Sequence, residues 1–132
     1  PGEPHPPYNT TPPTSGWHYV NTADWGVHTE PVPDELQVHN LEHGGVLLQY
    51  NCGPEPEGGA LDDAACQEIH DQLASITRRY RSKVFTAPYP GMPHRIAVTS
   101  WTRMMTLDAV DEEKIIKYIE QYKNTGPERV PD

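Results

Sequence analysis

The fold is decided by the stretch Val38-His39-Asn40-Leu41-Glu42-His43-Gly44-Gly45-Val46, which continues as Leu47-Leu48-Gln49-Tyr50. Two histidines four residues apart share one face of a helical turn, and a pair of glycines ends such a turn. The apolar run that follows predicts a short buried strand. The stretch therefore predicts a rigid turn that holds two imidazoles at the edge of a core. Two ordinary surface histidines are the alternative interpretation.

Helices and strands alternate after this stretch. Asp62 or Asp63 is a candidate cap for a helix whose apolar residues recur at a three-four spacing from Cys66 to Tyr80. A second such helix follows Asp108 or Asp111. Strands are predicted at 83–87 and 94–101, and residues 103–107 are compatible with a further strand.

The predicted fold class is α+β. We expect a small mixed sheet of three to four strands covered by two amphipathic helices, because a strand–helix–strand unit implies a parallel pair and the later hairpins are antiparallel. Residues 1–35 contain repeated prolines and predict an extended arm packed on the core through Trp17 and Trp25. Asp34 is the expected cap of a short helix that ends at the glycines. Residues 36–132 form the α+β part, and the length of 132 residues predicts one domain overall.

The composition limits the partners. The net charge is −9, and no basic patch is present, which excludes nucleic acid and an anionic membrane surface as partners. The chain opens on Pro1 without a methionine and has no apolar run long enough to span a bilayer. We expect an extracytoplasmic protein, in the periplasm or at the cell surface, whose N-terminal signal or membrane anchor has been removed.

The chain has only two cysteines, Cys52 and Cys66. A disulfide between them would pin a flexible loop and stabilise the fold by about 3 kcal/mol in the chain-entropy model. Such a bond agrees with an exported protein. Thiolate ligation of a metal is the alternative, but the spacing is not Cys-x-x-Cys. His70, beside the apolar stripe of the first long helix, is interpreted as a solvated residue.

A metal site is predicted from the histidines and from one methionine. His39, His43 and Met92 are the expected ligands, and His18 or His94 completes the set. A thioether is a soft ligand, so histidine with methionine favours copper as Cu(I) or Cu(II), with zinc as the alternative. The predicted role is copper transport, buffering, delivery or electron transfer; an enzymatic activity is left open and is not the favoured interpretation, and another metalloprotein is the expected partner. A homo-oligomer is compatible with this prediction.

Two other functions are alternatives to copper binding. The first is a structural or interaction domain without metal, in which histidines and tryptophans fasten the arm to the core. The second is a zinc-dependent hydrolase, because His39-Asn40-Leu41-Glu42-His43 matches the pattern H-x-x-E-H, in which the glutamate is the base. That pattern belongs inside a long helix, whereas glycines follow His43 at once.

Several blocks of the sequence resemble the DUF3105 family. They are 12–18 (Pro-Pro-Thr-Ser-Gly-Trp-His), 30–35, 38–46 and 50–52 (Tyr-Asn-Cys), and later Gly91-Met92-Pro93 with 96–101. The resemblance implies an extracytoplasmic protein of unassigned function, often with an N-terminal membrane segment. His18, His39, His43 and Met92 fall inside these blocks, whereas His28, His94 and Met104 do not. The Thr102-Arg103-Met104 segment departs from the Gly-Arg expected after Trp101.

Overall fold

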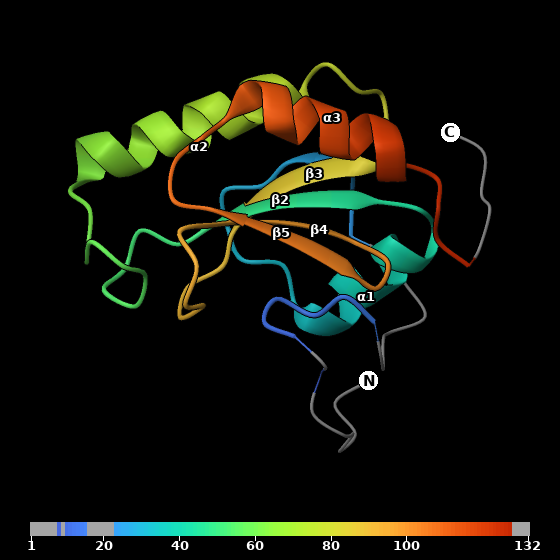
Figure 1. The fold of residues 1–132 in the computed structure, drawn as a ribbon, viewed down its shortest axis with the longest axis horizontal. Coiled ribbons are helices and arrows are strands. Elements are labelled where there is room, and N and C mark those ends of the chain that lie inside the picture. Colours follow the sequence, from blue (N-terminus) through green and yellow to red (C-terminus); the bar gives the residue numbers. More distant parts are fainter. Residues whose placement is uncertain (1–7, 9, 16–22, 128–132) are drawn as a thin grey trace.

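The computed structural model describes residues 8, 10–15 and 23–127 of the chain. Five strands and three helices follow one another in these residues (Figure 1). Their order is β1 (Gly26–Val27), α1 (Asp34–Glu42), β2 (Val46–Tyr50), α2 (Asp63–Thr77), β3 (Val84–Pro88), β4 (Ile96–Ser100), β5 (Arg103–Leu107) and α3 (Glu112–Tyr122). The α+β class predicted from the sequence is confirmed.

The strands form one mixed sheet with the order β1-β3-β2-β4-β5. β1, β3 and β2 run parallel to one another. β4 is antiparallel to β2, and β5 is antiparallel to β4. The sheet has one strand more than the upper limit predicted. The additional strand, β1, lies inside the proline-rich arm, so part of that arm belongs to the sheet itself.

Helices cover both faces of the sheet (Figure 1). α2 and α3 lie over one face, where apolar residues of alternate strand positions meet Leu73, Ile76, Ile115 and Ile119. These two helices are the amphipathic pair that the sequence predicted. α1 lies on the opposite face, so the sheet is the middle layer of three.

The layer between α1 and the sheet is smaller and more polar. Leu41 packs there with Leu47 and Phe85, and the ring of Trp25 packs against this cluster. Trp25 belongs to the segment predicted to be the arm, and Trp17 lies outside the described residues. Gln49 and Thr99 are also fully buried. Among the described residues, the amide nitrogen and oxygen of Gln49 and the hydroxyl of Thr99 have no hydrogen-bond partner.

The helix starts follow capping rules in two of three cases. Asp62 caps α2 by accepting a hydrogen bond from the Ala65 N–H at 2.8 Å, and Asp111 caps α3 in the same way. The predicted cap of α1 is wrong. Pro33 occupies the capping position, and Asp34 is the first helical residue, where its carboxylate accepts a hydrogen bond from the Tyr89 hydroxyl at 2.8 Å.

Candidate functional site

The last turn of α1 and its C-cap hold the two central histidines, His39 and His43. The rings of His39 and His43 meet edge to face, with their centroids 4.6 Å apart. Leu41 is buried against the sheet and is two residues from each histidine, so both imidazoles project from the opposite side of α1. The predicted pairing of the two rings is confirmed, and both remain partly exposed.

Close backbone contacts fix this turn. Gly44 has φ +86°, and its carbonyl accepts a hydrogen bond from the Asn124 N–H at 2.8 Å. A Cβ atom on Gly44 would lie 2.5 Å from the Asn124 Cα atom, and one on Gly45 would lie 2.7 Å from the Trp25 ring. The glycine pair is therefore required by the close approach of two distant segments, as well as by the end of the helix.

Lys83 supplies a positive charge at the end of α1. Its side chain is almost fully buried, and its ammonium donates a hydrogen bond to the His43 carbonyl. A cation at this position complements the negative end of the helix dipole. The Lys83 carbonyl accepts from the Val46 N–H at 2.8 Å, so the same residue also connects β3 to the start of β2.

The other predicted ligands do not join this pair. Met92 is fully buried, and its carbonyl accepts from the Asn51 side chain, just beyond the end of β2. His94 precedes β4, whose first residue Ile96 pairs with Tyr50, the last residue of β2. Both therefore lie at the opposite end of β2 from His43, about 16 Å along a five-residue strand.

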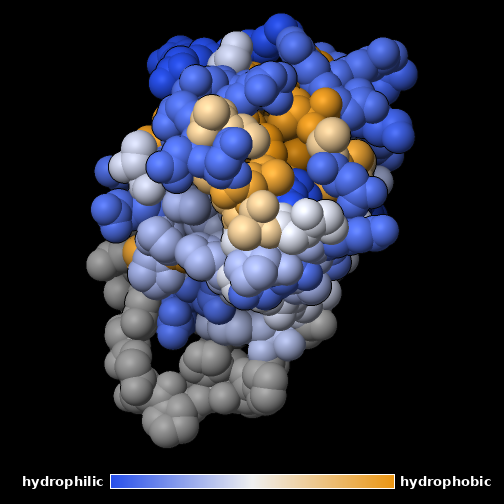
Figure 2. Space-filling view, turned by 90° about the vertical axis from the view of Figure 1, so that its left-hand side faces the viewer, coloured by the Kyte–Doolittle hydropathy of each residue, from blue (hydrophilic) through white to orange (hydrophobic). Residues whose placement is uncertain are grey.

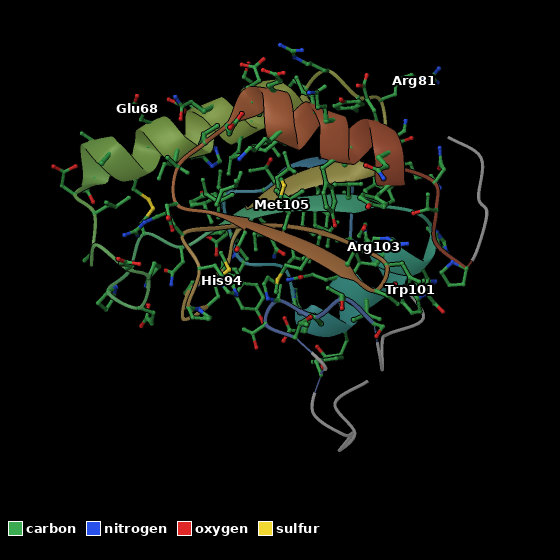
Figure 3. The ribbon with its side chains drawn as sticks, in the orientation of Figure 1. Glu68, Arg81, His94, Trp101, Arg103 and Met105 are labelled. Atoms are coloured by element: carbon green, nitrogen blue, oxygen red, sulfur yellow. A yellow bond between two sulfur atoms is a disulfide. The ribbon has the colours of Figure 1, made fainter. Side chains whose placement is uncertain are left out.

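Figure 3 shows His94 and Trp101 at opposite ends of the sheet, and the α1–β2 turn is at the Trp101 end. His18 lies outside the described residues. Within residues 8, 10–15 and 23–127, no three His, Cys, Asp or Glu side chains are grouped to hold a metal ion. In the described part of the chain, the imidazoles of His39 and His43 therefore lie next to each other, and neither Met92 nor His94 lies beside them.

Glu42 is the final residue of α1, which is nine residues long. The H-x-x-E-H string therefore ends its helix and does not lie within a long one. The helix provides neither a third zinc ligand after His43 nor a continuous wall for a substrate cleft. This geometry gives the hydrolase interpretation no support.

A second cluster of reactive groups lies at the carboxyl ends of the parallel strands. Cys52, just after β2, forms a disulfide with Cys66 in α2, as predicted. The Tyr50 hydroxyl and the His70 Nδ1 atom are 2.8 Å apart, and their rings pack edge to face. The sequence interpretation of His70 as merely solvated missed this pair. No local spacing signals this pair, because Tyr50 and His70 are 20 residues apart and lie on different elements.

The environment of Tyr50 keeps its hydroxyl protonated. Burial, followed by the negative charge of Asp71, raises the pKa of Tyr50 above its ordinary value. The hydroxyl occupies the Nδ1 atom of His70, either as donor to the neutral ring or as acceptor from the imidazolium, and leaves Nε2 to the other side. Tyr50 can therefore orient the imidazole and fix which nitrogen faces the neighbouring groups.

No helix in the described ranges is long and apolar enough to cross a membrane. A comparison with curated proteins finds none that matches this chain. A protein-family model described as "Protein of unknown function (DUF3105)" matches residues 5–131. Because that match covers nearly the whole chain, the chain belongs to the DUF3105 family.

Proposed function

We propose that this protein binds a transition-metal ion through His39 and His43, with copper as the preferred ion. The observation that supports this proposal is the 4.6 Å separation of the two ring centroids at a fixed turn. Two imidazoles that bind one ion at adjacent positions, each at about 2.0 Å, have ring centres about 4.5–5 Å apart. The observed separation lies within that range.

The ligand set determines the oxidation state in this proposal. With Met92 buried at the other end of β2, the soft thioether that would favour Cu(I) is not beside the imidazoles. Imidazole nitrogens alone bind divalent ions in the Irving–Williams order, in which Cu(II) exceeds Ni(II) and Zn(II). The proposal is therefore a Cu(II) site, with Zn(II) as the competing ion and His18 as the candidate third ligand.

The proposed setting is outside the cytoplasm. A disulfide is typical of oxidising compartments, and Cys52 and Cys66 form one. In such a compartment the site would carry, buffer or deliver copper, or exchange electrons with another metalloprotein.

Metal binding can be tested with variants at three histidines. His39→Ala and His43→Ala should each lower Cu(II) affinity by about ten-fold or more, since even residues that only orient a ligand contribute that much. His94→Ala is the matched control and should bind as wild type does, because His94 lies at the other end of the sheet. Affinities would be measured by competition with a chromophoric Cu(II) chelator, using protein without a histidine tag.

Two results would contradict this proposal. One is wild-type protein that fails to compete with a chelator of micromolar affinity. The other is an equal loss of affinity in all three variants, which would indicate nonspecific binding by surface imidazoles. Met92→Leu conserves volume and should leave Cu(II) affinity unchanged.

A further inference from the structure

A cleft opens at the edge where the three parallel strands end. Its walls come from Thr29 after β1, from Tyr50 and Cys52 at the end of β2, and from Pro88 and Pro90 at the end of β3. The carboxyl edge of parallel strands is the usual ligand-binding edge of an α/β sheet. Figure 2 views the molecule from this side, where hydrophilic residues surround an apolar area; the lining of the cleft itself consists mostly of polar residues, prolines and glycines. The cleft has a volume of about 430 Å³, enough for a side chain or a short extended segment.

The disulfide lies in the wall of this cleft. Both Cys52 and Cys66 line it, and both residues are only partly buried. Figure 3 shows the disulfide at the same end of the sheet as His94. A disulfide in this position can be reached by a substrate thiol.

Other interactions already hold the loop that the disulfide closes. The Leu61 N–H donates to the Cys52 carbonyl at 2.9 Å. The buried Arg95 guanidinium donates to the carbonyls of Asn51 and Gly59, at the two ends of the same loop. The loop is therefore tied down without the sulfur–sulfur bond, and opening that bond need not unfold it.

His70 gives the disulfide an acid–base partner. Cys66 and His70 are one turn apart on α2, and both line an adjoining cleft of about 460 Å³ together with Tyr50. The Cys66 side chain also points back toward the start of α2, where the helix dipole favours a thiolate. The carboxylate of Asp63 lines this cleft as well and acts against that effect, so His70 is the group in this lining that could offset it with a proton.

We propose that Cys52 and Cys66 form an exchangeable disulfide that oxidises paired thiols of a substrate bound at this cleft. The thiolate of a substrate dithiol attacks the Cys52 sulfur, a new sulfur–sulfur bond forms, and the bond between Cys52 and Cys66 breaks. The electron pair of the broken bond stays on Cys66, which takes a proton from the imidazolium of His70. A leaving thiol that is stabilised as the thiolate departs faster.

The second substrate thiol completes the exchange. It gives its proton to the neutral His70, attacks the substrate sulfur of the mixed disulfide, and releases Cys52 as a thiolate that takes a proton from water. Two electrons have then moved from the substrate to the protein. The substrate is a disulfide, and Cys52 and Cys66 are thiols.

Native reduction of the folded protein tests this step. Oxidised protein would be mixed with dithiothreitol or with a peptide carrying two cysteines, quenched with iodoacetamide, and counted for alkylated cysteines by mass spectrometry. We expect complete reduction without denaturant, retention of the far-ultraviolet circular dichroism spectrum, and formation of the oxidised probe. A peptide that reacts faster than dithiothreitol would identify polypeptide thiols as the substrate, and equal rates would indicate a small dithiol.

The variant His70→Asn separates exchange from a purely structural bond. It should slow reduction about ten-fold or more while leaving the melting temperature near that of wild type, because acid–base assistance is worth at least this much. Gln72→Asn, an exposed change on the same helix, should react as wild type does. Reduction that requires denaturant, loss of the fold on reduction, or equal rates for His70→Asn and wild type would overturn the proposal. None of these results depends on metal binding at His39 and His43.

Discussion

Gly44→Ala should lower the free energy of unfolding by about 3 kcal/mol, whereas Gly91→Ala should cost about 1 kcal/mol. Both glycines have nearly the same positive φ, +86° and +87°. An alanine in this region costs about 1 kcal/mol in either place. Only Gly44 has a backbone neighbour, with the Asn124 Cα atom 2.5 Å from the position of a Cβ, and overpacking of this kind costs about 1–3 kcal/mol more.

Urea denaturation of both variants measures this difference directly. Gly91→Ala serves as the matched control, because among the described residues, its two chain neighbours apart, no atom lies within 4 Å of its added Cβ. Equal destabilisation of the two variants would mean that the segment around Asn124 gives way freely. In that case the turn that carries His39 and His43 is less rigid than the structure indicates.

Arg95→Met should destabilise the protein by about 3 kcal/mol and expose the loop that follows β2 to proteolysis. Arg95 is 5% exposed and donates to the carbonyls of Asn51 and Gly59. Hydrogen bonds of a charged group contribute about 1.5–3 kcal/mol each, and methionine keeps much of the apolar stem while removing both donors. The measurement is urea denaturation of the oxidised protein, followed by limited proteolysis and mass mapping of the cleaved bonds.

Arg95→Lys is the control for charge alone. A lysine ammonium is a compact donor without the planar fork of arginine, so it cannot reproduce both bonds in the same geometry. The free energy of unfolding of Arg95→Lys should lie between those of wild type and Arg95→Met. If Arg95→Met is as stable and as resistant to protease as wild type, the loop is held by the disulfide instead, and the argument for exchange at Cys52 loses its support.

The predictable part of the fold is the part with strong periodicity. The apolar stripe from Cys66 to Ile76 and the Asp62 cap defined α2, and alternation along 96–100 defined β4. β1 was missed because two residues carry no period, and only their pairing with Phe85 and Thr86 makes them a strand.

The candidate sites, too, were predictable only where a local sequence pattern exists. The pairing of His39 with His43 follows from helical spacing and was predictable. The expected convergence of Met92 on that pair required knowing which end of β2 each loop occupies, and no local pattern records this. The Tyr50–His70 pair joins a strand to a helix across 20 residues, so it depends on how the two elements pack.

The polar layer under α1 makes the two faces of the sheet unequal in local unfolding. The α2–α3 side is closed by apolar contacts, whereas the α1 side contains the buried atoms of Gln49 and Thr99 that lack partners among the described residues. An unsatisfied buried polar atom costs about 1–3 kcal/mol, so opening this side recovers free energy when water reaches those atoms. The backbone amides of α1 should therefore exchange with solvent through smaller openings than those of α2. An ion bound at His39 and His43 would slow that exchange, because it would stabilise the side of the molecule that opens most easily.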